Sequence, residues 1–310
     1  MRQIIIIFTI AIAWTAGFAQ DSPIKLQNVN LGQMLSNMPG SYPLALDQSV
    51  IDKANAGDAE SQYRYGIYLR RMDLADKFLQ LDTEELGKEA VQWFERAAAQ
   101  GHAEASIEAG IIYFQRYNAS LEMFSERSLN RRKAVNFLRQ GGAENDASLM
   151  LVLARLAFCF DDNGNLLNQG QETINLCKDA LAKGLPVMVD APLHRSSVYP
   201  RDRIDAYMLM ATAYEIGSHD LSNYFANIYL AADCGDKLAR LYLGECYYAG
   251  IGTAEDRAKA TEIWDALIAE DSLYSSDVGK VKTKYTDNSN VPKESVFESP
   301  EDILRALIVD

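Results

Sequence analysis

Apolar residues recur at three- and four-residue steps between residues 57 and 270, which is the spacing of one face of an α-helix. Segments with this spacing begin at Gly57, Gly101, Asn145, Asp202 and Gly235, and each is followed by a second segment of the same kind. Every unit therefore predicts two helices joined by a turn. The starts lie 44, 44, 57 and 33 residues apart, so we expect insertions in some of the turns.

Small and large residues alternate in a fixed order within these units. In the last unit a small residue, a glycine and a tyrosine stand at Ala239, Gly244 and Tyr247. Glycine lets two helices approach closely, and aromatic rings fill the wider gaps. We assign this packing role to Gly66, Trp93, Gly110, Tyr113, Tyr214, Gly244, Tyr247 and Trp264. Gly250 and Gly252 are expected to end one helix and reverse the chain, because glycine tolerates positive backbone angles. Since one helix pair cannot bury its own apolar face, the pairs are expected to stack.

The stretch ARLYLGECYYAGIGTAEDRAKATEIWDAL, from Ala239 to Leu267, resembles a Sel-1-like repeat, a relative of the tetratricopeptide repeat. KEAVQWFERAAAQG, from Lys88 to Gly101, matches the second half of the same motif. The resemblance implies an all-α, right-handed superhelical solenoid of four to five helix pairs over residues 57–270. It also implies a concave groove, and a role as an adaptor that binds another protein or a peptide.

The first 19 residues have the pattern of a secretory signal peptide. Arg2 precedes the apolar run Ile4–Trp14, and Gly17 and Ala19 are the small residues before a cleavage point. The run is too short to span a bilayer and no second long apolar run follows, so no membrane span is expected after cleavage. We therefore predict export, and the resemblance favours a bacterial periplasmic or secreted protein.

The flanks of the repeat region are predicted to be less regular. Residues 20–56 suggest a polar arm with a short helix near Gln48–Ala54. A loop with three prolines is expected over 185–201, a linker over 271–298, and a last helix over 299–310 that would close the stack.

Charge and residue spacing argue against several functions. The net charge is −13, or −14 without the signal peptide, and we find no basic face, so nucleic-acid binding is not expected. His102, His194 and His219 lack metal-ligand spacing, and no nucleophile or phosphate-binding motif occurs. We predict no enzyme activity, no metal and no cofactor.

Two sets of residues are candidates for a partner groove. Phe114, Phe158 and Tyr248 share one offset near the end of the first helices, where an aromatic row would suit a peptide; burial against the next repeat is the alternative. Glu60, Glu104 and Asp205 share a first-turn offset, where they could face a basic partner or simply favour the helix dipole.

Other possibilities remain open at this stage. Cys159 and Cys177 flank one turn and could form a disulfide. The protein could instead bind cell wall or glycan through its tyrosines, or be a weak β-lactam hydrolase, as some cysteine-rich relatives of the family are. Self-association is not predicted either way.

Overall fold

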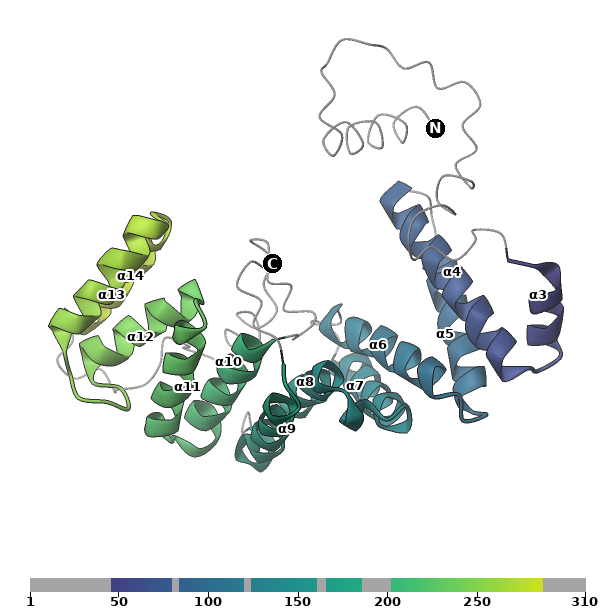
Figure 1. Cartoon of the computed structure of the whole chain (residues 1–310), viewed down its shortest axis with the longest axis horizontal. Coiled ribbons are helices and arrows are strands. Elements are labelled where there is room, and N and C mark those ends of the chain that lie inside the picture. The colour runs from purple at the N-terminus through teal and green to yellow at the C-terminus, as the bar shows by residue number, and fades with distance from the viewer. Residues whose placement is uncertain (1–45, 80–83, 120–123, 161–165, 186–201, 287–310) are drawn as a thin grey trace, which may run out of the picture. The chain divides into compact units, whose positions relative to one another are not determined.

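The computed structural model describes residues 46–79, 84–119, 124–160, 166–185 and 202–286, and it divides the chain into two compact units after Ala109 (Figure 1). Within these ranges the chain forms helices and no strand, apart from an isolated bridge between Phe160 and Leu166. The predicted all-α class is confirmed. The predicted signal peptide, the 186–201 part of the proline loop and the 299–310 helix lie outside the described residues.

The first unit is a small helical assembly that ends within α6. Its helices are α3 (Gln48–Asn55), α4 (Ala59–Leu79), α5 (Glu84–Ala98) and the beginning of α6 (Ala103–Ala119). α4 packs against both α3 and α5. A Cβ atom at Gly66 would lie 2.7 Å from Cε1 of Phe94, so glycine is what lets α4 and α5 approach this closely.

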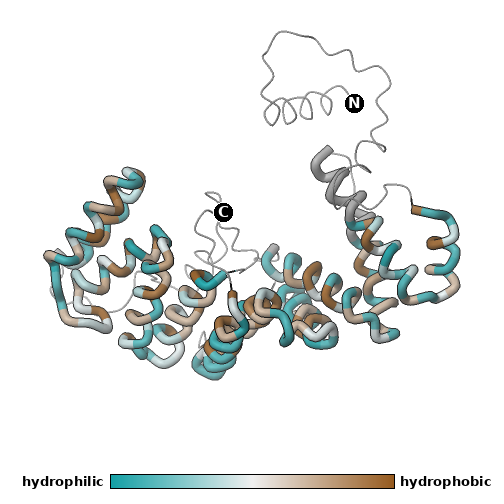
Figure 2. The backbone as a smooth tube through the Cα atoms, in the orientation of Figure 1, coloured by the Kyte–Doolittle hydropathy of each residue, from teal (hydrophilic) through white to brown (hydrophobic). Residues whose placement is uncertain are grey.

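The second unit continues the series of helix pairs. Its helices are the rest of α6, α7 (Phe124–Gln140), α8 (Ala147–Ala157), α9 (Gln171–Ala182), α10 (Arg203–Ala213), α11 (Leu221–Asp233), α12 (Lys237–Ala249), α13 (Arg257–Glu270) and α14 (Tyr274–Thr286). α8 packs on α9, α10 on both α9 and α11, and α12 on both α11 and α13. The pairs of this unit therefore stack in sequence order. Apolar and polar residues alternate along the helices (Figure 2). None of the described helices is both long and apolar enough to cross a membrane.

The first helix of each pair begins at an equivalent capping residue. Asp58, Asp146 and Asp236 each accept a hydrogen bond from the backbone N–H three residues on, at 2.9, 2.9 and 2.7 Å. His102 takes this position in the second copy, where its Nδ1 accepts from the Ala105 N–H at 3.3 Å. In the fourth copy Asp202 forms a capping box. Such caps satisfy N–H groups that have no partner within the helix.

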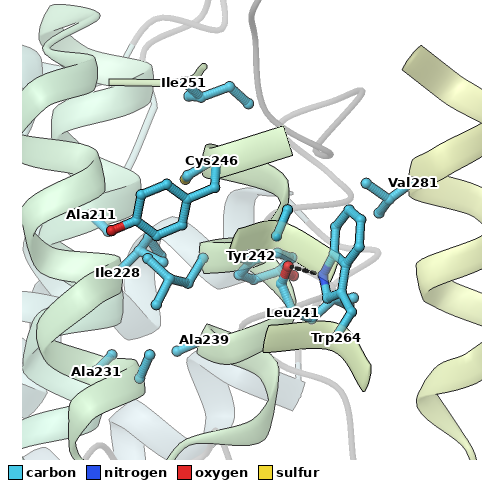
Figure 3. Packing of buried hydrophobic residues seen from close by; sticks show 14 of the residues in the cluster. Ala211, Ile228, Ala231, Ala239, Leu241, Tyr242, Cys246, Ile251, Trp264 and Val281 are labelled. Carbon is cyan, nitrogen blue, oxygen red and sulfur yellow. Dashed lines mark hydrogen bonds between the residues drawn. The ribbon is translucent and has the colours of Figure 1, made fainter. Parts of the chain in front are cut away.

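Trp264 is the largest fully buried side chain of the second unit's core. Its Nε1 donates a hydrogen bond to the Leu241 carbonyl at 3.0 Å, as Figure 3 shows. The ring lies directly on Gly244, because a Cβ there would be 2.5 Å from Cε2 and 2.6 Å from Cδ1 of the indole. Gly244 of the motif's Leu-Gly pair therefore leaves the space that the Trp264 ring of the following helix fills.

The two glycines of the motif's turn adopt the left-handed backbone conformation. Gly250 has φ 71° and ends α12, and Gly252 has φ 64°. A Cβ at Gly252 would also lie 2.6 Å from the Leu221 carbonyl carbon. The turn therefore requires glycine at residue 252 for its backbone angle and for the space available.

Two further aromatic residues of the motif, Tyr113 and Trp93, pack beside other rings. Tyr113 stacks on Phe137 with ring centroids 5.9 Å apart, and Trp93 lies 5.1 Å from Tyr65. Tyr247 is buried, and Tyr214 is half-buried at the start of a single π-helical turn, Tyr214–Ser218.

The predicted linker over 271–298 is wrong where α14 lies. Val278 and Val281 of α14 are buried against α12 and α13, and Val281 lies beside Trp264 in Figure 3. Tyr285 and Lys284 contact Glu245 of α12. α14 therefore packs its apolar side against the last helix pair of the described residues.

Candidate functional site

The predicted aromatic row does not form a surface. Phe114 and Phe158 are both 0 % exposed, so neither can contact a partner. Phe158 belongs to the core shared by α8, α9 and α10, and its ring meets Phe160 edge to face at 5.6 Å. The offset near the end of the first helix therefore points into the stack, and the burial alternative is correct for these two residues.

Tyr248 is the one member of the row that keeps some exposure, and other side chains surround it. Its ring lies 5.3 Å from Trp264 and 6.3 Å from Tyr285, and the Arg257 guanidinium is 4.8 Å from its centroid. Tyr248 thus joins α12 to α13 and α14. It differs from the other two predicted groove residues in burial.

The three predicted carboxylates have separate local roles. Glu60 and Glu104 both approach His102, at 3.1 Å from its Nε2 and 3.3 Å from its Nδ1, and their side chains are about two-thirds exposed. Asp205 closes the capping box of α10 with Asp202. Among the described residues, no group of His, Cys, Asp and Glu is arranged to hold a metal ion.

The predicted Cys159–Cys177 disulfide is absent, because all four cysteines are free thiols. Cys159 follows the end of α8, whereas Cys177 lies six residues into α9, about 9 Å along that helix. Cys177 is also buried in the core. Burial raises the pKa of both thiols, so neither is activated as a nucleophile.

A hollow of about 180 Å³ lies between α7, α8 and α9, and sequence reasoning did not find it. Apolar residues of α7 and α8 form part of its wall, and charged side chains form the rest. Its lining consists of Arg131, Arg132, Val135, Asn136, Arg139, Leu153, Ala157 and Glu172. The hollow combines an apolar surface with guanidinium groups, which is the composition of a site for an acidic segment.

Two of its arginines are held in place by the protein. Arg131 Nε donates to the Leu156 carbonyl at 2.6 Å, at the end of α8. Arg139 Nη2 lies 2.8 Å from the Glu172 carboxylate of α9. Arg132 is exposed and has no ion-pair partner among the described residues. The hollow therefore presents two arginines that have partners within the protein and one exposed arginine that can turn toward a ligand.

The signal for this hollow was present in the sequence. α7 carries Arg127, Arg131, Arg132, Lys133 and Arg139 against the single acid Glu126. The net charge of −13 averages over the whole chain and therefore does not show this local excess of basic residues.

Glu245 is a buried carboxyl group that belongs to the core. It is 1 % exposed and accepts from the Tyr285 hydroxyl at 2.8 Å and from Lys284 Nζ at 3.4 Å. Burial raises its pKa, although Lys284 and Tyr285 act in the opposite direction. The folded protein then holds this proton more tightly than the unfolded chain does. Its stabilising contribution is full below the unfolded pKa of about 4.3 and is lost as pH rises through the folded pKa.

Comparisons with known proteins found likenesses only among solved structures. No family model matches the chain, and no curated protein matches it significantly. One similar structure is c5321, a protective antigen of uropathogenic Escherichia coli that displays an SLR fold, with 20 % identity and a TM-score of 0.47. The match covers 83 % of this chain but only 48 % of that protein.

Another similar structure is a Sel1 repeat protein from Oxalobacter formigenes. It has 20 % identity and a TM-score of 0.45, and the match covers 81 % of this chain and 87 % of that one. Both carry the name of the repeat that the motif of this chain resembles.

Proposed function

We propose that this chain, an array of Sel-1-like helix pairs, is a scaffold for protein–protein interaction, and that the hollow between α7, α8 and α9 receives an acidic segment of the partner. The observation that carries the proposal is the arginine-lined hollow on the most basic helix of an acidic protein. Helical repeats serve widely as extended binding surfaces, and this hollow offers both apolar contact and charge.

The chemistry of the hollow suits anionic groups such as carboxylates. Guanidinium groups bind carboxylates through two parallel hydrogen bonds, and arginines that are already oriented lose less side-chain entropy on binding. Arg139 is already oriented by Glu172, and an incoming carboxylate would share that guanidinium. The local positive charge also attracts an acidic segment and repels a basic one.

Peptides selected by display on the folded protein test this proposal. We expect the selected sequences to be rich in aspartate and glutamate. The double charge reversal Arg132→Glu with Arg139→Glu is expected to weaken their binding by about tenfold or more in fluorescence anisotropy.

The matched control reverses two exposed lysines elsewhere, Lys183→Glu with Lys280→Glu, and so changes the net charge equally. It is expected to leave affinity within about twofold, because rim charges away from the contact act weakly. Peptides without acidic residues, or equal losses in both double variants, would contradict the proposed site.

Export is a separate part of the proposal and rests on residues 1–19 alone. Its test is the N-terminal sequence of the protein recovered from the periplasm or the culture medium. We expect it to begin at Gln20. A chain that keeps its first methionine and stays with the cytoplasm would contradict export but leave the binding site untouched.

A further inference from the structure

His102 occupies the capping position of α6, where other copies of the repeat have an aspartate. Asp58, Asp146, Asp202 and Asp236 each cap the first helix of their copy through the side-chain carboxylate. An aspartate is ordinarily ionised throughout the range between pH 5 and 8, whereas histidine is the side chain that ordinarily titrates within it. The cap of α6 is therefore formed by a group that gains a proton where aspartate caps do not change.

The Nδ1 atom of His102 lies between a hydrogen-bond donor and an acceptor. It is 3.3 Å from the backbone nitrogen of Ala105 and 3.3 Å from Oε2 of Glu104. An unprotonated Nδ1 accepts from the Ala105 N–H, whereas a protonated Nδ1 donates to the Glu104 carboxylate and has no lone pair for the cap. The two bonds thus exclude each other, and the protonation of one atom selects between them.

The other contacts of His102 are the same in both states. Nε2 lies 3.1 Å from Oε2 of Glu60 on α4, and it carries a proton both in the neutral ring that caps α6 and in the charged ring. The ring also lies beside that of Tyr63 on α4, with centroids 4.6 Å apart. The His102 backbone N–H donates to the Ala97 carbonyl of α5 at 3.2 Å, and the His102 carbonyl accepts from the Ser106 N–H at 3.1 Å. The proton is therefore gained by a ring that is already held in place.

The two states are close in free energy, because each loses what the other gains. The neutral ring satisfies one N–H group of the first turn of α6. The charged ring exchanges this cap for ion pairs with two carboxylates whose side chains are 65 % and 68 % exposed. Helix caps and exposed ion pairs make contributions of similar size. A change of pH near neutrality therefore moves the balance between the states and does not unfold the helix.

We propose that His102 is a protonation switch at the start of α6. At high pH its Nδ1 caps the Ala105 N–H. At low pH the ring takes one proton from solvent, releases that N–H, and pairs with Glu60 of α4 and with Glu104. Charge strengthens the hydrogen bond to Glu60, so acidification loosens the first turn of α6 and tightens its contact with α4. The switch lies in the first unit and does not depend on the hollow between α7, α8 and α9.

Nuclear magnetic resonance of the full chain, labelled with ¹⁵N in histidine and alanine, tests the switch between pH 5 and 8. We expect Nδ1 of His102 to be unprotonated at pH 8, and both ring nitrogens to be protonated at pH 5. The Ala105 amide signal should move with the same midpoint as the ring. Hydrogen exchange of this amide, corrected for its intrinsic rate at each pH, should be about fivefold faster at pH 5, which is the effect of losing one helix cap.

Three variants make the result specific. His102→Asp restores the residue of the other copies and should keep the cap throughout this range, so the pH-dependent change in exchange disappears. Glu104→Gln removes the carboxylate that receives the proton of Nδ1 and should move the midpoint to lower pH. His219→Asn is the matched control, because His219 is exposed and has a left-handed backbone conformation that asparagine tolerates. It should leave the response of Ala105 unchanged.

Three results would overturn the switch. One is a His102 ring whose Nδ1 already carries a proton at pH 8. Another is an Ala105 amide signal that does not follow the titration of the ring. The third is a His102→Asp variant whose amide exchange responds to pH as that of the original protein does.

Discussion

Replacing Gly244 by alanine tests the packing on which the last helix pairs depend. The added Cβ would lie 2.5 and 2.6 Å from two carbons of the Trp264 indole and closer still to its Nε1. The indole is fully buried and cannot turn away without leaving its hydrogen bond to the Leu241 carbonyl. Since the clashing atoms belong to a rigid ring, α12 and α13 would have to move apart.

The size of the effect follows from three contributions. Overpacking of a core costs about 1–3 kcal/mol, and the loss of a buried hydrogen bond costs about 1–3 kcal/mol more. Alanine offsets about 1 kcal/mol of this, because it is the better helix former. We therefore expect a net loss of about 3 kcal/mol. With an m-value of about 2 kcal/mol per M, the urea midpoint falls by roughly 1.5 M.

The assay is urea unfolding followed by circular dichroism, with Gly279→Ala as the matched control. No atom would lie within 4 Å of a Cβ at Gly279 in α14, so this variant should gain up to about 1 kcal/mol. The same substitution is thus expected to have opposite signs at two helical sites. Adding Trp264→Phe to Gly244→Ala should restore part of the loss, with a coupling of about 1 kcal/mol or more. If Gly244→Ala is as stable as Gly279→Ala, the close packing of α12 on Trp264 is wrong.

Four further outcomes follow from the structure. Val281→Ala should cost about 2 kcal/mol in urea unfolding, because it removes two buried carbon groups from the contact that holds α14; no loss would mean that α14 does not dock. Glu245→Gln should gain stability relative to the original protein as pH rises above about 4.3, since the raised pKa makes the original lose stability there; a difference independent of pH would contradict the raised pKa. Asp202→Ala removes the capping box of α10 and should cost about 1 kcal/mol in the same urea assay, and an unchanged midpoint would argue against the cap. Alkylation in denaturant without reductant should label all four cysteines by mass spectrometry, and a protected pair such as Cys159 and Cys177 would contradict the free thiols.

The repeat itself could be predicted because its constraints are local. Glycine against an aromatic ring, as at Gly66 and Gly244, leaves a fixed spacing in the sequence. Helix starts are similarly marked by a capping aspartate such as Asp236. These features depend on residues within one helix pair, so a single sequence contains them.

The sequence alone does not show which apolar side chains are buried between helices and which lie on the surface. Helical spacing shows that Phe158 lies on an apolar face, but it does not show which neighbouring helix covers that face. α14 was missed because few of its residues are apolar, and Val278 and Val281 were too few to mark a helix. The burial of Arg155 was missed because it depends on how neighbouring helices stack on α8, which helical spacing does not show.

The claim that the hollow is the partner-binding site is tested most directly by site-specific photocrosslinking in the native compartment. A photoreactive residue replaces Asn136, which lines the hollow, or Glu262, on the exposed surface of α13. Residue 136 is expected to give a defined protein adduct that disappears with Arg132→Glu and Arg139→Glu, whereas residue 262 gives none. Identical adducts from both positions, or an adduct at residue 136 that survives the charge reversal, would contradict the account.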